Sequence, residues 1–477
     1  MKFYLTWFRF VSTMERHSDA SRQSTNPAVT TTTKTFRSFG VVIVLVIFIF
    51  GYTALTMNHS RSVYYGGTIP PPVEVASRSG PKHRTVHADT KGSFAASRDN
   101  REGNGIKPQE PKDVNVTLRE SFLDKITASI GDNVVSKAKI ILIIAYMRTG
   151  STLTGAIFQS FPGTFYVFEP IRLIGSFFNS MARNKMQRGT LKFANGTQRN
   201  VLLEDKQSII LDEINSWLNC KLTALNIHTL SNPHHAQHTN IMAAFTNCMK
   251  EEKKKQTPNL RRCFDEATSL CKKAPLRIIK FIRIKMKDAA MLLLLYPNLK
   301  IVHLVRDPRG IMNSRFKIHM ASEDKIKSQV VGHCTTVYED LKISKEIISE
   351  FPGRLKVILY EDLAERPLET AQSMFRFSGL PFNDYVQTFV ERQTSAQRNS
   401  GKYTTLRKNS TVTANTWRKQ IRFKVQNIVY NSCLESNKII GYLPFSSEKM
   451  LRNLTVASRK KLDVNAELLK SKIKYSS

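Results

Sequence analysis

The chain has 477 residues, of which 41% are hydrophobic and 23% charged, a composition that supports two or three packed domains and excludes a wholly disordered chain. Its 72 Lys and Arg residues outnumber 38 Asp and Glu residues, which gives a formal net charge of +34 at pH 7. Such an excess attracts nucleic acid, anionic membrane surfaces, phosphorylated cofactors and acidic glycans. The cellular compartment of the protein is needed to choose among these partners.

The first predicted element is a membrane span at residues 39–57, an uncharged and strongly apolar run. Its length is close to the ~20 residues that cross a bilayer as a helix. A cleaved signal peptide is the alternative, but the 38 residues before the run are far more than a normal leader places there. The sequence therefore predicts a cytoplasmic tail at residues 1–38 and a transmembrane signal anchor at residues 39–57.

The orientation of this anchor is inferred mainly from residues on its C-terminal side. Lys34 and Arg37 before the span and Arg61 after it give only a slight positive-inside bias. Glycosylation sequons and cysteines both point to a lumenal, disulfide-permissive side, and all of them come after the span. The sequons begin at Asn58, Asn115, Asn195, Asn409 and Asn453, and the cysteines are Cys220, Cys248, Cys263, Cys271, Cys334 and Cys433. We predict a single-pass type II protein; six cysteines allow fifteen pairings, so the connectivity stays open.

Residues 58–135 contain Pro70-Pro71-Pro72 and no sustained apolar periodicity, which predicts a flexible lumenal stem. Residues 136–450 then read as a folded head, and residues 451–477 as a basic C-terminal tail. Short apolar runs in the head predict strands that alternate with helical patterns, and this alternation is typical of an α/β fold with a doubly wound parallel sheet. The predicted strands are 140–145, 165–168, 276–284, 299–305 and 355–360; helices are expected at 289–295 and 326–351, and a helical insertion at about 175–275.

The strongest local motif is the polar turn Arg148-Thr-Gly-Ser-Thr between the first strand and a helix. Backbone N–H groups and the helix dipole form an anion site in such a turn, and Arg148 adds a fixed charge. Ser151 and Thr152 can donate hydrogen bonds to a phosphate and cap the helix. Capping alone is the alternative explanation of these residue types. The turn is not a Walker A loop, because GxxxxGK[ST] is absent.

A second motif follows the strand 299–305 and reads Arg306-Asp-Pro-Arg-Gly-Ile-Met-Asn-Ser314. Pro308 ends the strand and presets the start of a helix. Arg306 and Ser314 can then converge on one phosphate, where the guanidinium supplies charge and the hydroxyl a directional bond. An Arg–Asp surface ion pair with an ordinary cap is the alternative.

Together the two motifs resemble those of the Golgi carbohydrate sulfotransferases, in particular the branch that acts at the 6-hydroxyl of galactose, N-acetylgalactosamine or N-acetylglucosamine. The resemblance covers residues 137–445 and includes Phe168-Glu-Pro and Tyr360-Glu-Asp-Leu. It implies a P-loop-like fold, a Golgi location and 3′-phosphoadenosine 5′-phosphosulfate (PAPS) as co-substrate, without a metal. The implied 5′-phosphosulfate loop comprises Arg148, Thr149, Gly150, Ser151, Thr152, Leu153 and Thr154. The implied 3′-phosphate element comprises Arg306, Asp307, Pro308, Arg309, Gly310, Ile311, Met312, Asn313 and Ser314.

The chain departs from the family pattern at a few positions. Thr149 and Thr152 stand where the family more often has Ser, which keeps the hydroxyl. Leu359 stands where the family usually has Arg before Tyr-Glu-Asp, and this puts the local packing or a substrate contact in doubt.

A sugar hydroxyl needs a base to accept its proton, and Glu169 follows a strand near the edge of the sheet where ligands bind. By resemblance, the Glu of Phe-Glu-Pro is the family's leading base candidate, and a helix cap or ion pair is its structural alternative. Arg148 is the other predicted catalytic residue. His303 is a competing base, but its place inside an apolar strand favours a core histidine.

Three further groups of residues could bind ligands. His228, His234, His235 and His238 lack any zinc-ligand spacing and indicate a solvated loop, so no metal is expected. The basic stretch 398–408 and Trp417 can grip phosphate or stack on a ring, or form a plain charged surface. The expected partner is an anionic glycan or glycosaminoglycan rather than nucleic acid, and a homo-oligomer stays open. The rivals are a P-loop kinase-like enzyme, weakened by the missing Walker lysine, and a glycan-binding glycoprotein without activity.

Overall fold

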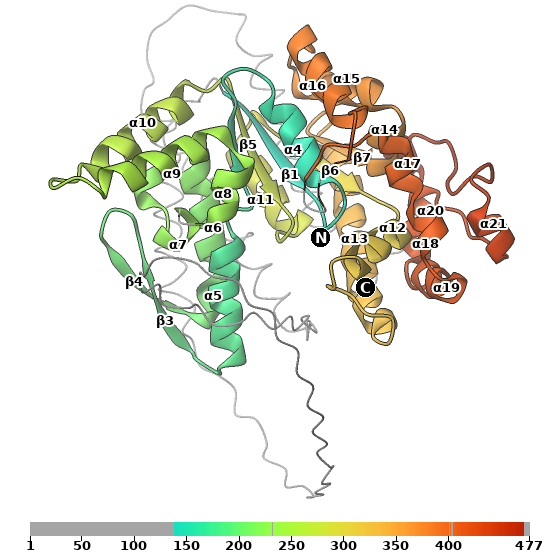
Figure 1. Ribbon diagram of the computed structural model, residues 1–477. Helices are drawn as coiled ribbons and strands as arrows, with labels where there is room; N and C mark the ends of the chain where they lie inside the picture. Colours follow the sequence, from blue (N-terminus) through green and yellow to red (C-terminus); the bar gives the residue numbers. More distant parts are fainter. Residues whose placement is uncertain (1–137, 231, 400, 402–403, 472–477) are drawn as a thin grey trace, which may run out of the picture. The chain divides into compact units, whose positions relative to one another are not determined.

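Five parallel strands form the centre of the folded head, in the spatial order β2-β5-β1-β6-β7 (Figure 1). The computed structural model describes residues 138–471 except residues 231, 400, 402 and 403. The strands are β1 (Lys139–Ile144), β2 (Phe165–Phe168), β5 (Leu276–Phe281), β6 (Leu299–Val305) and β7 (Leu355–Leu359). Each strand falls in an apolar run that the sequence predicted as a strand, although β5 ends three residues before the predicted run 276–284 does.

Helices cover both faces of this sheet, because successive strand residues point to opposite sides and both sides are apolar. Ile141 and Ile143 of β1 pack with one set of helices, while Ile140, Leu142 and Ile144 pack with another. The first set is α4 (Ser151–Gln159), α15 (Pro367–Ser378) and α16 (Asp384–Thr394); the second includes α6 (Lys206–Leu218), α11 (Met286–Leu295) and α13 (Ile326–Glu350). The prediction of a doubly wound α/β sheet with flanking helices is confirmed.

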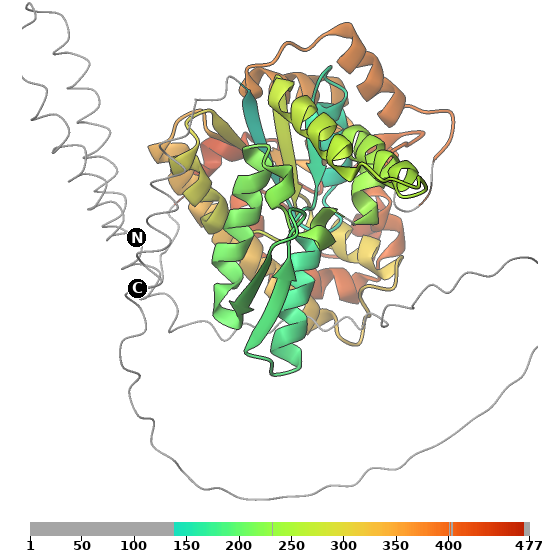
Figure 2. The same ribbon diagram turned by 90° about the vertical axis from the view of Figure 1, so that its left-hand side faces the viewer.

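The insertion between β2 and β5 lies to one side of the sheet (Figure 1). Its helices are α5 (Arg172–Arg183), α6, α7 (Ile227–Leu230), α8 (Pro233–His238), α9 (Asn240–Glu252) and α10 (Leu260–Lys273). It also contains an antiparallel hairpin, β3 (Arg188–Lys192) and β4 (Gln198–Leu202), which lies beside α5 (Figure 2). The sequence predicted only helices here, because just Leu191 and Val201 are buried in the two strands and one apolar residue per strand gives no alternating pattern.

All six cysteines form disulfides. Cys220–Cys271 and Cys248–Cys263 lie within the insertion, whereas Cys334–Cys433 joins α13 to the end of α19. The disulfides agree with the disulfide-permissive environment that the sequence predicted.

Beyond the β7 edge, opposite to the insertion, lies a set of short helices that includes most of the C-terminal part (Figure 1). They are α12 (Pro308–Phe316), α14 (Tyr360–Glu365), α17 (Ser410–Asn415), α18 (Trp417–Gln420), α19 (Phe423–Ser432), α20 (Leu434–Ile440), α21 (Glu448–Arg452) and α22 (Val464–Lys470). Residues after 450 were expected to form a tail, but Leu451 and Leu468 are fully buried. Asn465 accepts a hydrogen bond from the Val357 N–H at 2.8 Å, so α22 is attached to β7. The segment contains many basic residues and few apolar ones, so its composition alone suggested an exposed tail.

The predicted cytoplasmic tail, membrane anchor and stem, residues 1–135, lie outside the described residues. Among the residues that are described, no helix combines the length and the hydropathy that a membrane crossing requires.

Candidate functional site

The turn after β1 has an unusual backbone that exposes the start of α4. Arg148 has a φ of 76° and Gly150 a φ of 92°, both in the left-handed region. Thr149 holds the turn closed, because its hydroxyl donates to the Tyr146 carbonyl at 2.7 Å and accepts from the Tyr146 N–H at 3.3 Å. Gly150 is the N-cap residue and no side chain caps the helix. Ser151 therefore begins the first turn instead of capping it, and the helix start stays available to an anion.

Arg306 and Ser314 meet this turn from the second motif. The Arg148 Nε donates to the Ser314 hydroxyl at 2.9 Å, and an Arg306 guanidinium nitrogen donates to the Arg148 carbonyl at 2.9 Å. β1 and β6 are neighbours whose following connections lead to opposite sides of the sheet, to β2 and to β7. This is a topological switch point, where doubly wound folds bind their ligands. The two predicted phosphate elements thus come together at one place, 166 residues apart in the sequence at Arg148 and Ser314.

The middle of the second motif faces the C-terminal helices instead. Asp307 caps α12 by accepting from the Arg309 N–H at 2.9 Å, and Pro308 opens the helix. The fully buried Arg309 guanidinium binds Asp307 and donates to the Leu443 carbonyl at 2.8 Å. Ile311 and Met312 are core residues, and Asn313 donates to Gln420 at 3.0 Å. Of this element, Arg306 and Ser314 form hydrogen bonds with Arg148 of the β1 turn.

Tyr360, the first residue after β7, connects the two motifs, and the sequence predicted no role for it. Its ring lies under the Arg306 guanidinium, with 4.1 Å between the guanidinium carbon and the ring centroid. The same ring touches Gly150 so closely that a Cβ at that position would collide with it. The available signal was the position of this aromatic residue at the carboxyl end of a strand, the edge where Arg148 and Arg306 also lie.

Glu169 follows β2 and is 7% exposed, with a φ of 47°. Its carboxylate binds Lys280 Nζ at 2.6 Å and forms a second ion pair with Arg283. Burial raises the pKa of this carboxyl, but the charges of Lys280 and Arg283 outweigh it and leave the pKa below its ordinary value. Glu169 is therefore ionised at neutral pH and held by two cations at the carboxyl ends of β2 and β5.

His303, the competing base, lies in a buried polar network beneath the β1 turn. Its ring nitrogens contact the Tyr146 hydroxyl at 2.9 Å and the Ser344 hydroxyl at 2.8 Å. The Tyr146 hydroxyl also donates to Asp340 at 2.9 Å. Burial lowers the pKa of His303 to about 3 and raises that of Asp340 to about 6. A fully buried, neutral histidine with both nitrogens in contact supports the turn and does not face an acceptor, as the apolar strand around it predicted.

The histidine group of the insertion is partly buried rather than a solvated loop. His235 is fully buried, and the His238 ring stacks on Phe168 with 4.1 Å between centroids. Burial lowers the pKa of His235 to about 4. In the described part of the chain, no three His, Cys, Asp or Glu side chains are placed to hold a metal ion.

The late basic stretch brings one side chain toward the site. Burial lowers the pKa of Arg407, and the neighbouring charge of Arg306 adds to this effect. Trp417 is 4% exposed and packs against the Arg309 guanidinium at 4.8 Å from its ring centroid, so it does not offer a face to adenine or sugar.

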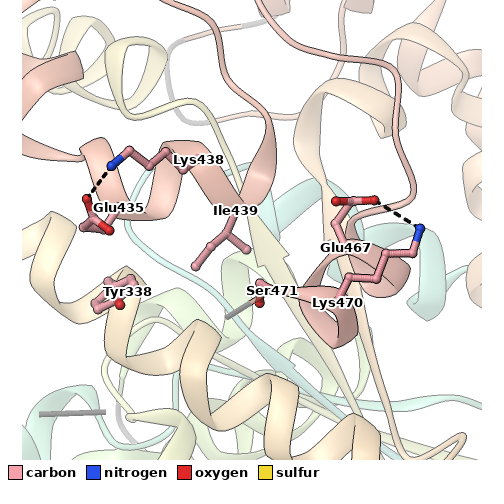
Figure 3. Close-up of a pocket in the computed structure, with 7 residues that line it drawn as sticks. All are labelled: Tyr338, Glu435, Lys438, Ile439, Glu467, Lys470 and Ser471. Carbon is pink, nitrogen blue, oxygen red and sulfur yellow. Dashed lines mark hydrogen bonds and ion pairs between the residues drawn. The ribbon is translucent and has the colours of Figure 1, made fainter. Parts of the chain in front are cut away.

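A pocket of about 250 Å³ lies away from these residues, between α13, α20 and α22 (Figure 3). Its lining residues are Tyr338, Glu435, Lys438, Ile439, Glu467, Lys470 and Ser471. The lysines are paired within their own helices, Lys438 with Glu435 at 3.0 Å and Lys470 with Glu467 at 3.5 Å. The pocket therefore offers no convergent charge for a phosphate, and the candidate site remains the edge that carries Arg148 and Arg306.

Comparison with known proteins gives consistent matches. The sequence model of the sulfotransferase family matches residues 141–384. Carbohydrate sulfotransferase 3 of Mus musculus is 24% identical over 66% of this chain and 71% of its own length. Carbohydrate sulfotransferase 1 of Homo sapiens is 26% identical over 68% of this chain and 84% of its own length.

Solved structures show a weaker likeness. Mouse sulfotransferase SULT7A1 complexed with PAP has a TM-score of 0.32 and 10% identity, covering 66% of this chain and 88% of that one. The sulfotransferase domain of the Synechococcus PCC 7002 olefin synthase has a TM-score of 0.31 and 16% identity, covering 61% and 93%. The fold assignment rests on the order and direction of the strands in the sheet.

Proposed function

This chain belongs to the sulfotransferase family and is an enzyme of that type, and we propose that it transfers sulfate from PAPS to a hydroxyl of a carbohydrate. The observation that carries the proposal is the convergence of Arg148, Arg306 and Ser314 at the switch point of the sheet. Two guanidinium groups at one place repel each other unless an anion lies between or beside them. PAPS supplies phosphate groups at two positions, which matches two separate basic elements.

In the proposed reaction, the acceptor oxygen attacks sulfur, and the bond between sulfur and the 5′-phosphate oxygen breaks. Negative charge then develops on the departing phosphate. Arg148 and the N–H groups at the start of α4 are positioned to stabilise this charge. Arg306 and Ser314 hold the 3′-phosphate and so orient the donor, while Tyr360 fixes the direction of Arg306.

Glu169 is the proposed acceptor of the hydroxyl proton. It lies on the same edge of the sheet as Arg148, with β5 between their two strands, which places the strand ends about 10 Å apart. A carboxylate with a lowered pKa is a weak base. Its contribution to the rate is therefore expected at the lower end of the usual range for general bases, about 10²-fold.

The names of the relatives support a glycan acceptor, and we extend the proposal to the 6-hydroxyl of Gal, GalNAc or GlcNAc in keratan- or chondroitin-type chains. The resemblance of the two motifs to those of the Golgi carbohydrate sulfotransferases favours a Golgi location for the head. A type II anchor at residues 39–57 and a stem to residue 135 would place it in the lumen.

The test is transfer of radiolabelled sulfate from PAPS by the purified full-length chain to a panel of desulfated glycosaminoglycans. Arg148→Ala is expected to abolish transfer with an unchanged melting temperature, because its guanidinium serves the site, where it binds Ser314. Arg306→Ala and Ser314→Ala are expected to raise the KM for PAPS by roughly tenfold or more, the value of a charge-assisted hydrogen bond. Transfer by Arg148→Ala at the wild-type rate, or no binding of PAPS by the wild type, would rule out the assignment.

A further inference from the structure

A group of cations around Glu169 exceeds what that carboxylate can neutralise. Lys280 and Arg283 both pair with the Glu169 carboxylate, and the Arg172 N–H donates to the Glu169 carbonyl at 3.2 Å. The charge of Arg172 therefore acts on both Arg283 and Glu169. Three cations and one carboxylate leave a local charge of +2. Among the described residues, no other carboxylate lies within ion-pair distance of Arg172 or Arg283.

The two arginines differ from Lys280 in their exposure. The Lys280 side chain is 2% exposed, whereas that of Arg283 is 40% exposed and Arg172 is partly exposed. Lys280 is thus fully used inside the protein, where it pairs with Glu169 and covers the Phe168 ring at 4.0 Å from the centroid. Arg283 and Arg172 keep donor groups that an external anion can reach, since a guanidinium has five N–H donors.

The position of Arg172 at the start of a helix makes its positive charge unfavourable. It is the first residue of α5, a helix with no acidic residue in its first turn and no side-chain cap. A positive charge at this end of a helix opposes the helix dipole. Burial also disfavours its charged form and lowers its pKa, and the charge of Arg283 does so further. An anion bound beside Arg172 and Arg283 would relieve each of these costs.

The location relates this group to the reaction. Arg283 follows β5 by two residues and Arg172 lies in the helix after β2, while the turn with Arg148 follows β1 next to β5. The group therefore lies at the carboxyl edge of the sheet, beside the phosphate elements and on the side opposite to Arg306. That is where an acceptor would extend away from the donor.

We propose that Arg172 and Arg283 form a subsite for an anionic group, a sulfate or a carboxylate, carried by the acceptor glycan near the hydroxyl that receives sulfate. The proposal rests on the proposed function only for the identity of the acceptor. Glu169 is then a positioning residue for Arg283 in addition to its proposed part in proton transfer.

The experiment is equilibrium binding of three tetrasaccharides to the full-length chain without PAPS. One is a sulfated keratan tetrasaccharide, one a desulfated chondroitin tetrasaccharide whose only anion is the uronate, and one a neutral desulfated keratan tetrasaccharide. The wild type is expected to bind at least one acidic probe about tenfold more tightly than the neutral one, and the preferred probe identifies the anion as sulfate or carboxylate. Equal affinities for all three would overturn the proposal.

Variants of the two arginines test whether they cause the tighter binding of acidic probes. Arg172→Gln, which removes no ion pair between described residues, and Arg283→Gln are expected to bind all three probes with the same affinity. Arg261→Gln is the matched control, because Arg261 is 89% exposed on α10 and its removal changes the net charge equally. Discrimination that survives Arg172→Gln and Arg283→Gln, or disappears in Arg261→Gln, would contradict the subsite. Discrimination by a wild type that transfers no sulfate would refute the proposed function and leave the subsite standing.

Discussion

At the scale of single residues, the two arginines of the site are oriented by different kinds of contact. Arg306 is directed by a carbonyl and an aromatic ring, and Arg148 by a hydroxyl and a left-handed backbone. The sequence predicted that Arg148, Arg306 and Ser314 bind phosphate, because residue type, strand ends and motif order all indicate it, and the structure brings these three residues together. For Tyr360 the sequence offered its aromatic type and its place at a strand end, but not its contact with Arg306. That contact and the pairing of Glu169 with Lys280 join segments that the order of strands brings together.

Glu169 is the residue whose role is most sharply testable. We expect Glu169→Gln to lower the single-turnover rate by about 10²-fold while PAPS affinity is nearly unchanged, because glutamine keeps the shape but accepts no proton. Both quantities are measured on one preparation. A rate within a few-fold of wild type, together with a lower melting temperature, would restrict Glu169 to holding Lys280 and Arg283.

The same substitution has a predictable pH dependence. The folded-state pKa of Glu169 lies below its ordinary value of 4.5, so its ion pairs stabilise the fold fully above that value and progressively less as pH falls through the folded-state pKa. The part of the difference in unfolding free energy between wild type and Glu169→Gln that comes from this carboxyl is therefore fully present down to about pH 5 and shrinks below it. Urea titrations from about pH 5 to about pH 3 measure it, and a difference that grows as pH falls through this interval would contradict the depressed pKa.

At the scale of elements, the site is formed by turns that pack tightly against one another. The β1 turn, α12 and α14 contact one another through Gly150, Tyr360 and Arg306. The sequence predicted the strands and both turns, because fully apolar runs and breakers are local signals. It missed the β3–β4 hairpin and the docking of α22, since there only one or two apolar residues per element are buried.

Ala substitutions at two glycines with similar backbones distinguish the effect of backbone strain from that of a steric clash. Gly150 and Gly196 have φ values of 92° and 85°, but a Cβ on Gly150 would strike the Tyr360 ring, whereas nothing lies within 4 Å of one on Gly196. Gly196→Ala is expected to cost about 1 kcal/mol of stability and leave activity intact. Gly150→Ala is expected to displace Tyr360 and raise the KM for PAPS by roughly tenfold or more. Equal kinetics for the two variants would show that Tyr360 does not position Arg306.

The disulfides should differ in what they contribute. Cys334–Cys433 closes a separation of 99 residues and Cys248–Cys263 one of 15. Loop-closure entropy predicts losses of about 4–5 and about 3 kcal/mol for the respective double Cys→Ser variants. Urea unfolding with the remaining disulfides intact measures this order. A larger loss for Cys248–Cys263 would show that local packing in the insertion, and not the entropy of the unfolded chain, dominates.

At the scale of the whole molecule, the fold class followed from the alternation of elements and the enzyme class from two motifs in order. The charge excess alone could not locate the binding site of a partner, because 72 basic residues are spread over the chain. Many of them bind other groups of the protein. Arg309 and Arg418 are almost fully buried and donate to backbone carbonyls or Asp307, so their guanidinium groups cannot contact an external anion directly. Only the arrangement shows which cations remain available at the carboxyl edge of the sheet.

The net charge of +34 nevertheless has a measurable consequence for the choice of acceptor. A polyanionic chain is attracted over distances comparable to the Debye length, which falls from about 10 Å at 0.1 M salt to about 3 Å at 1 M. At saturating PAPS, we expect kcat/KM for a sulfated keratan chain to fall at least tenfold between about 0.05 and 0.3 M NaCl, because each released counterion steepens the dependence. For a neutral desulfated oligosaccharide the change should stay within about twofold, since no long-range attraction is screened. The neutral acceptor also controls for any salt effect on donor binding or on the chemical step. If both acceptors show the same salt dependence, the positive charge of this enzyme does not serve to capture its acceptor.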